Sequence, residues 1–150
     1  MIVIIQRVLR GSVKIDGKKH AEIGKGYVIL VGFCKEDKEE YVDKMAHKIK
    51  NLRIFEDEEG KMNKSINEIN GEILLVPNFT LCSSLKKGRR PSFDNAMEPE
   101  SAKKLFNIFE FKLKNFGINV KTGVFGAKME VEIINDGPVT FIITNEDLGL

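Results

Sequence analysis

Apolar residues along most of the chain either alternate with polar ones or run together in short stretches. This pattern, rich in Val and Ile, is typical of β-strands. Turn sequences such as Asp16-Gly17 and Asn70-Gly71 stand between some of the stretches and favour hairpins. The pattern predicts strands at 2–8, 12–15, 21–23, 27–33, 54–55, 73–76, 118–121, 129–134 and 139–144.

Two segments instead repeat their apolar residues every three or four positions, as amphipathic helices do. The first is expected at 38–51, where Asp37 and Glu40 resemble a capping box. The second follows Pro99, which the first turn of a helix accepts, and ends at Gly117. Strands outnumber helices, and the hairpins imply mostly antiparallel pairing. We therefore predict an α+β or mixed α/β fold, with a curled, barrel-like sheet and two main packed helices.

Length and composition fit a single domain over residues 1–150, with 145–150 as a loose tail. The chain has 150 residues, 42% hydrophobic and 31% charged, and a formal net charge of +2. No apolar run approaches the roughly 20 residues of a membrane-spanning helix, and the apolar start is too short for a signal peptide. We expect a cytoplasmic protein without a membrane partner.

Cysteine and histidine are scarce in the sequence. Cys34 and Cys82 lie in or beside apolar segments, so we expect both to be reduced, packed thiols. His20 and His47 have no carboxylate or thiol cluster around them at metal-ligand spacing. The sequence therefore predicts neither a metal site nor a cofactor.

One short loop concentrates positive charge. Such a cluster is either solvated surface or a contact for a phosphate backbone, where each contact releases condensed counterions. Composition alone does not choose between these interpretations. The loop holds Lys86, Lys87, Arg89 and Arg90.

A Gly-Pro pair, Gly137-Pro138, separates two apolar β-type runs near the C-terminus. Proline has no N–H for a sheet ladder, so it marks a turn, a bulge or an edge. Asn135 and Asp136, just before the pair, are turn-forming residues. Spacing alone favours a hairpin turn. The alternative is a rigid Gly-Pro unit, cis or trans, that holds its carbonyls out to a ligand.

The segment Pro77-Asn78-Phe79-Thr80-Leu81 follows the buried strand that ends at Val76. Its alternation fits the simple end of a strand. A strand that runs into a loop also leaves backbone N–H groups without ladder partners, and such donors can hold a developing oxyanion. We therefore regard 77–81 as a candidate site.

Taken together, 77–81 and 135–140 resemble the D-aminoacyl-tRNA deacylase family, whose two signatures are Ser-Gln-Phe-Thr-Leu and Asn-X-Gly-Pro-X-Thr. The resemblance extends from Met1 to about Ile143. Pro77-Asn78 stands where the family has Ser-Gln, so no role of that serine hydroxyl passes to Pro77, and Asn78 reaches one methylene less far. Other similar stretches, in the family's order, are Ile5-Gln6-Arg7-Val8, Leu52-Arg53-Ile54-Phe55, 87–93 and 122–129.

The resemblance implies a homodimer that hydrolyses the ester between a D-amino acid, or glycine, and the terminal adenosine of a tRNA. Neither DNA nor a membrane is expected as a partner. It also implies a cis Gly137-Pro138 that enters the pocket of the other subunit and is braced by Arg7. Its main-chain carbonyls would then exclude the Cβ of an L-residue but admit the hydrogen of a D-residue or glycine.

The resemblance assigns further roles by position. Phe79 and Thr80 supply the catalytic N–H donors. Phe125 and Met129 line the pocket, although ordinary core packing is an alternative for both. The remaining substrate contacts are Asn78 and Leu81, and the contacts to acceptor-stem phosphates are Lys86, Lys87, Arg89 and Arg90.

Two roles are open for the Thr80 hydroxyl. A covalent nucleophile would need an adjacent base, and none lies near it in sequence. Positioning of the substrate, with the ribose 2′-OH assisting water, needs no such base, so we favour it. Two other functions also stay open: a non-catalytic RNA-binding module that uses the basic loop, and a hydrolase of free D-amino acid esters.

Overall fold

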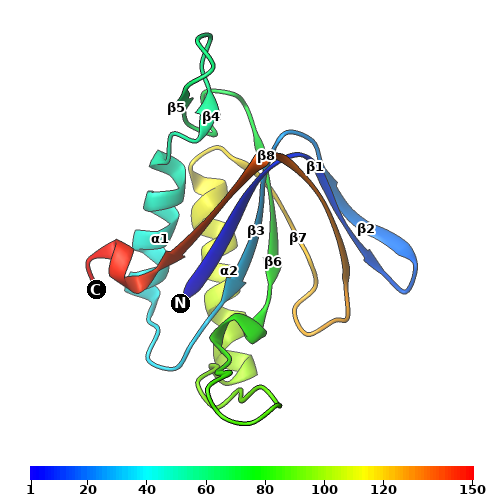
Figure 1. The fold of residues 1–150 in the computed structure, drawn as a ribbon, viewed down its shortest axis with the longest axis vertical. Helices are drawn as coiled ribbons and strands as arrows, with labels where there is room; N and C mark the ends of the chain where they lie inside the picture. The colour runs from blue at the N-terminus through cyan, green and yellow to red at the C-terminus, as the bar shows by residue number, and fades with distance from the viewer.

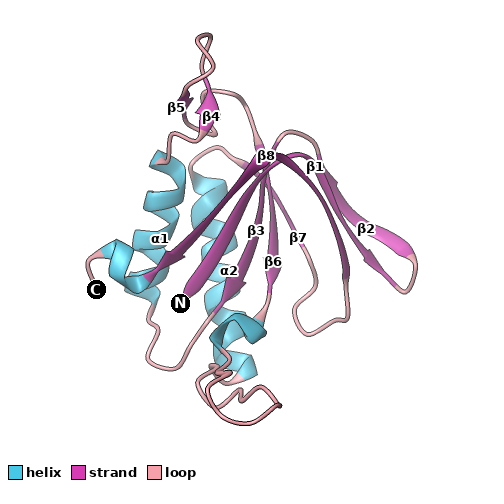
Figure 2. Cartoon of the chain, viewed as in Figure 1, coloured by secondary structure: helices cyan, strands magenta, loops and turns pink.

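A strongly curved sheet of six strands forms the centre of the computed structural model, which describes residues Met1–Leu150 (Figure 1). Its two helices, α1 (Glu39–Asn51) and α2 (Pro99–Asn115), cover one face of the sheet (Figure 2). A small two-stranded sheet of β4 (Phe55–Glu56) and β5 (Met62–Lys64) projects from one end. The strands of the main sheet are β1 (Ile2–Ile15), β2 (Lys18–Ile23), β3 (Gly26–Gly32), β6 (Glu72–Pro77), β7 (Asn119–Thr122) and β8 (Glu130–Thr144).

The sheet is mixed, and its order is β2-β1-β3-β6-β7, with β8 along the other edge of β1. β1 pairs antiparallel with β2, β3 and β8, whereas β3–β6 and β6–β7 are parallel pairs. The predicted fold class is therefore confirmed: a nearly closed, barrel-like mixed sheet with two helices.

The two predicted hairpins have different outcomes. Asp16-Gly17 does join an antiparallel pair, β1 and β2, in which Ile15 is opposite Lys18. The Asn70-Gly71 hairpin is wrong: Asn70 has the left-handed φ of 52° typical of a turn, but β6 then pairs in parallel with β3. Four consecutive residues of β6, Ile73–Val76, are buried, as expected of a parallel strand covered on both faces.

The main core lies between the sheet and the two helices. β1 contributes Val3 and Ile5 to it, and α2 contributes Phe109 and Leu113, all of them with no exposed surface. Alternate residues of β1, such as Ile4, face the other side of the sheet and stay partly exposed. The helices are held by their apolar faces. Both fall short of the length and apolarity that a membrane-crossing helix needs.

Asp37 does not cap α1 as the sequence predicts. The N-cap is Lys38, which makes no side-chain cap hydrogen bond. The Asp37 carboxylate instead accepts hydrogen bonds from the backbone N–H of Cys34 (2.7 Å), the amino group of Met1 and the side-chain amide of Asn145 (3.1 Å). It thus ties the start of β1 to the segments that follow β3 and β8, at one end of the sheet and just before α1.

The expected loose tail at 145–150 is wrong over most of its length. Residues Asn145–Leu148 form a short 3-10 helix, η2. Asp147 and Thr144 make a capping box at its start, and Asn145 donates to Asp37 as described above. These hydrogen bonds explain why a polar segment without apolar periodicity is ordered.

The prediction of two reduced cysteines is also wrong. Cys34, just after β3, is joined by a disulfide to Cys82, at the end of the 3-10 helix η1 (Phe79–Cys82). The parallel pairing of β3 with β6 brings the two segments that follow these strands side by side. Because the two cysteines are 48 residues apart in sequence, their proximity could not be predicted from their spacing. The disulfide fixes η1 to the sheet.

We predict that dithiothreitol lowers the free energy of unfolding by up to about 4 kcal/mol, the chain-entropy value for a loop of this length. Urea unfolding with and without dithiothreitol measures the change, with thiol titration to verify reduction. The Cys34→Ala/Cys82→Ala variant is the control, because it should not respond to dithiothreitol. Equal stability of the wild-type protein before and after full reduction would contradict the prediction.

Candidate functional site

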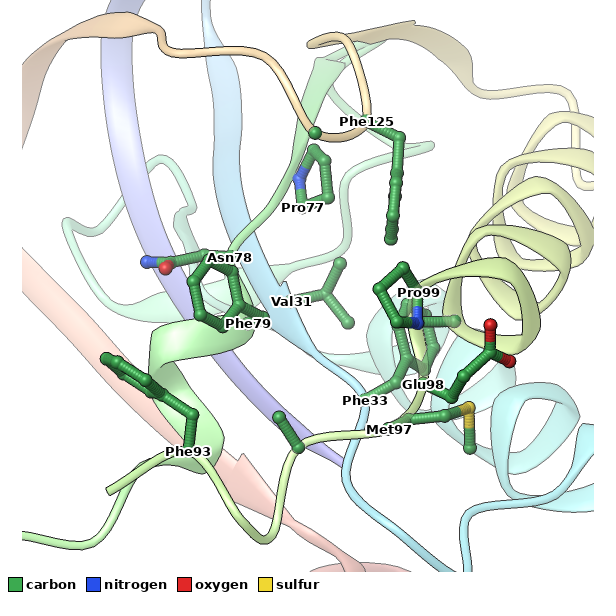
Figure 3. Close-up of a pocket in the computed structure, with 13 residues that line it drawn as sticks. Val31, Phe33, Pro77, Asn78, Phe79, Phe93, Met97, Glu98, Pro99 and Phe125 are labelled. Carbon is green, nitrogen blue, oxygen red and sulfur yellow. The ribbon is translucent and has the colours of Figure 1, made fainter. Parts of the chain in front are cut away.

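A largely apolar cavity of about 420 Å³ lies where the parallel strands β3 and β6 end (Figure 3). The carboxyl ends of parallel strands are a common place for ligand sites, because the chain leaves the ladder there. Residues from four parts of the chain form its walls: Val31 and Phe33; Pro77, Asn78 and Phe79; Phe93, Ala96, Met97, Glu98, Pro99 and Ala102; and Phe125 and Gly126.

The segment that follows β6 carries the predicted site residues. Asn78 N–H donates to the carbonyl of Val31 (2.8 Å), and the chain then turns into η1. The first N–H groups of a helix have no partner within it. In η1 these groups belong to Phe79 and Thr80. The local structure thus leaves two neighbouring backbone donors: Phe79 lines the cavity, and Thr80, the next residue, lies beside its wall without lining it.

The hydroxyl of Thr80 is engaged by its neighbour. It donates to Asn78 Oδ1 at 2.6 Å, so asparagine in place of the family's glutamine still reaches it. No histidine, lysine or carboxylate hydrogen-bonds to this hydroxyl in the structure. This arrangement favours a positioning role and provides no base for a covalent nucleophile.

Glu98 is the only carboxylate that lines the cavity. Its side chain caps α2 by accepting from the backbone N–H groups of Glu100 (3.0 Å) and Ser101 (3.2 Å). The hydrogen bond from Glu100 N–H holds the pKa of this carboxyl below its ordinary value. Glu98 is therefore ionised near neutral pH and serves as a helix cap.

The predicted pocket-lining residues are divided between two cavities. Phe125 lines the first cavity. Met129 lines a smaller one of about 340 Å³ on the side of the sheet away from the helices, which shares Pro77, Asn78, Phe79 and Gly126 with the first. Leu81 lines neither; it packs toward Gly32, where an added Cβ would come within 2.9 Å of the Leu81 Cβ. The structure thus brings Asn78, Phe79 and Phe125 together but leaves Thr80 and Leu81 outside the lining of both cavities.

Several lining residues were not predicted. They come from the loop before α2 and from its first turn, and include Met97, Glu98 and Ala102. Their apolar or capping character looks like ordinary helix packing in the sequence. Phe93 is an exception, since it ends a stretch, 87–93, that resembles the family.

Gly137-Pro138 lies inside β8 and not in a hairpin turn, so the interpretation from spacing alone is wrong. The peptide bond is cis. Gln6 pairs with Thr140 and Val8 pairs with Asn135, so residues 136–139 bulge out opposite a single β1 residue, Arg7. Gly137 and Pro138 line neither cavity of their own chain.

Two side chains hold this bulge from its two sides. Arg7, 4% exposed, donates from Nε to the carbonyl of Asp136 (3.0 Å) and from Nη1 to that of Ile54 (2.9 Å). Asn135 Oδ1 accepts from Val139 N–H (2.7 Å), and its Nδ2 donates to Thr140 Oγ1 (3.0 Å). Glycine is required at 137, because a Cβ there would lie 2.5 Å from the Val139 side chain.

The basic loop forms a narrow hairpin beside the first cavity. Ser84 and Ser92 close it with a pair of backbone hydrogen bonds of 2.8 and 2.9 Å. Its four basic side chains are exposed and have no carboxylate within ion-pair distance. They are Lys86, Lys87, Arg89 and Arg90.

The sequence of this chain is similar to that of known proteins over nearly its whole length. Residues 4–144 match the family model described as D-Tyr-tRNA(Tyr) deacylase. The chain is 59% identical over 148 residues to a D-aminoacyl-tRNA deacylase of Persephonella marina, covering 99% of this chain and 100% of that one. It is 51% identical to a D-aminoacyl-tRNA deacylase of Thermoanaerobacter sp., with 99% of each chain covered.

A solved structure of a c-Myc DNA Unwinding Element Binding Protein has a TM-score of 0.90 and 41% identity, covering 96% of this chain and 98% of that one. The chain belongs to the D-Tyr-tRNA(Tyr) deacylase family. The resemblance stated from its motifs is thereby confirmed.

Proposed function

We propose that the protein hydrolyses the ester of D-aminoacyl-tRNA, and of mischarged glycyl-tRNA, to a free amino acid and tRNA, and that it rejects L-aminoacyl-tRNA. The observation that carries this proposal is the apolar cavity beside the free N–H groups of Phe79 and Thr80, in a chain of this family. The substrate is the charged tRNA of cytoplasmic translation, and no cofactor takes part.

The first cavity suits the terminal adenosine of the tRNA. Ligand sites are mostly apolar, and flat rings pack well against aromatic side chains. Phe33, Phe79 and Phe125 supply such surfaces here. With the adenine in this cavity, the ester on its ribose lies at the rim, next to η1.

The reaction proceeds by attack of water on the ester carbonyl. The N–H groups of Phe79 and Thr80 stabilise the negative charge that develops on the carbonyl oxygen. The ribose 2′-OH assists the water, so that the RNA supplies the proton transfer that the protein lacks. The tetrahedral intermediate then releases the ribose 3′ oxygen, which takes up a proton. The Thr80 hydroxyl, held by Asn78, orients the ester.

The chiral filter is formed by main-chain carbonyls that a second subunit contributes. Gly137 and Pro138 line neither cavity of their own chain, which supports a contribution in trans. The sheet face away from the helices carries a row of apolar residues, Ile142, Ile4 and Leu30, directly opposite one another on three strands. Ile142 is 65% exposed, so this face suits a homodimer contact.

A wall made of backbone discriminates by steric overlap. The Cβ of an L-residue would meet the carbonyls of Gly137 and Pro138, whereas a D-residue or glycine places hydrogen there. Arg7 and Asn135 keep these carbonyls in position. Glycine passes because it has no Cβ, so the filter distinguishes configuration and not side-chain identity.

The proposal is tested with three substrates: D-Tyr-tRNA, L-Tyr-tRNA and a free D-tyrosine ester. We expect selective release of D-tyrosine from the tRNA. Binding of tRNA without turnover would instead support a non-catalytic RNA-binding module. Equal activity on the free ester would support a small-ester hydrolase that needs no RNA.

We predict that Thr80→Ala keeps substantial deacylase activity, with kcat reduced about tenfold or less, because one positioning hydrogen bond of about 1 kcal/mol is lost. Thr80→Ser, which keeps the hydroxyl, is the matched control and should stay near the wild-type rate. Single-turnover deacylation of D-Tyr-tRNA measures both. A folded, tRNA-binding Thr80→Ala protein without detectable turnover would show that Thr80 is the nucleophile.

We predict that Asn135→Ala lowers the ratio of D- to L-Tyr-tRNA hydrolysis by about tenfold, because the bulge at 136–139 loses its side-chain clamp. Asn119→Ala is the control. The side-chain amide of Asn119, on β7, donates to Glu72 Oε2 (2.9 Å) and takes no part in the bulge. Both ratios come from parallel kinetic assays. An unchanged ratio in a folded Asn135→Ala protein would argue against the gate.

A further inference from the structure

We propose that Phe93 and the hairpin 84–92 form a second nucleotide subsite, which holds the cytidine that precedes the terminal adenosine of tRNA. The inference rests on the proposed function, because it extends the same bound RNA by one residue. The ring of Phe93 stacks on the base, and the basic side chains of the hairpin contact the phosphates on either side of it.

The first observation is a pair of exposed aromatic rings at the rim of the first cavity. Phe79 is 57% exposed and Phe93 is 44% exposed. Their ring centroids are 5.2 Å apart, with an interplanar angle of 64°. In Figure 3 the two rings lie together on one side of the cavity, across from Phe125 and Glu98. One edge-on contact leaves most of each ring free to pack against a base.

The second observation is the charge next to these rings. Phe93 directly follows Ser92, which closes the hairpin with Ser84. The hairpin carries four basic residues, and Asp94 is the only carboxylate between Ser83 and Met97. Stacking rings beside a basic strip are the usual combination for binding single-stranded nucleic acid. An apolar protein partner would not need this charge.

The third observation is continuity with the adenosine cavity. Phe79 and Phe93 both line that cavity, contact each other and are partly exposed, so the platform continues outward from the cavity wall. The 3′ end of tRNA is single-stranded, with two cytidines before the terminal adenosine. An RNA chain that leaves the cavity on this side therefore passes first over Phe93 and then along the hairpin.

The test compares two short substrates: a D-tyrosyl ester of adenosine and the same ester of the dinucleotide cytidylyl-adenosine. The measured quantity is the gain in kcat/KM that the added cytidine gives. We expect a gain of at least about tenfold for the wild-type protein, in the range of base stacking on an aromatic ring. Phe93→Leu should reduce this gain to about twofold or less, whereas Phe93→Tyr should retain it.

Phe111→Leu is the matched control, since Phe111 is 63% exposed on α2 and lines neither cavity. Its cytidine gain should equal that of the wild-type protein. A wild-type protein that hydrolyses both substrates equally well overturns the subsite but leaves the proposed function intact. So does a Phe93→Leu variant that loses activity on both substrates to the same extent, because Phe93 then acts only as a wall of the adenosine cavity and not on the cytidine. Failure of the wild-type protein on charged tRNA itself removes the proposed function as well.

Discussion

The pairing of β1 with β8 is the constraint on which the rest of the site depends. The two strands are paired almost from end to end. Their register shifts where four residues of β8 face Arg7, and again beside it, where Leu9 has no partner between the pairs Val8–Asn135 and Arg10–Ile134. Because the ladder is continuous on both sides, this bulge has no freedom to slide along the sheet. The buried guanidinium of Arg7 and the amide of Asn135 then fix its main chain. The proposed filter is therefore part of the sheet itself.

The central parallel strands position the cavity, which is the other part of the proposed site. β3 and β6 end side by side, so the segments that follow them form one cavity and are joined by the Cys34–Cys82 disulfide. The Gly-Pro bulge and the strand-end cavity, the two parts of the proposed site, thus depend on different parts of one sheet. Gly137 and Pro138 do not line the cavity of their own chain, which supports the proposed dimer, in which each subunit would complete the site of the other.

The sequence predicted both helices, the fold class and the positions of most strands, because apolar periodicity records which face of each element is buried. It divided β1 and β8 into two strands each and missed β5. It failed where contacts between distant residues decide the outcome. Periodicity does not distinguish the parallel pairing of β6 from a hairpin after Asn70. The role of Asp37 as a tie between Cys34, Met1 and Asn145, and the disulfide, likewise depend on segments far apart in sequence.

The candidate site was found by its motifs more than by its chemistry. Phe79, Thr80, Arg7 and the Gly-Pro pair were identified from the family resemblance, and the cis peptide and the Arg7 contact agree with it. The wall formed by the start of α2 was missed, since Met97 and Ala102 have no distinctive chemistry. Leu81 was included because it belongs to the motif, but it packs away from the cavity.

The most direct measurement is a crystal structure with an uncleavable D-tyrosyl amide of 3′-amino-3′-deoxyadenosine. The present account predicts a dimer in which the ligand carbonyl accepts hydrogen bonds from Phe79 and Thr80 N–H. It also predicts that the partner's Gly137 and Pro138 carbonyls lie in contact with the ligand α-carbon. A ligand bound by one subunit alone, with no Gly-Pro main chain near its α-carbon, would contradict the central claim.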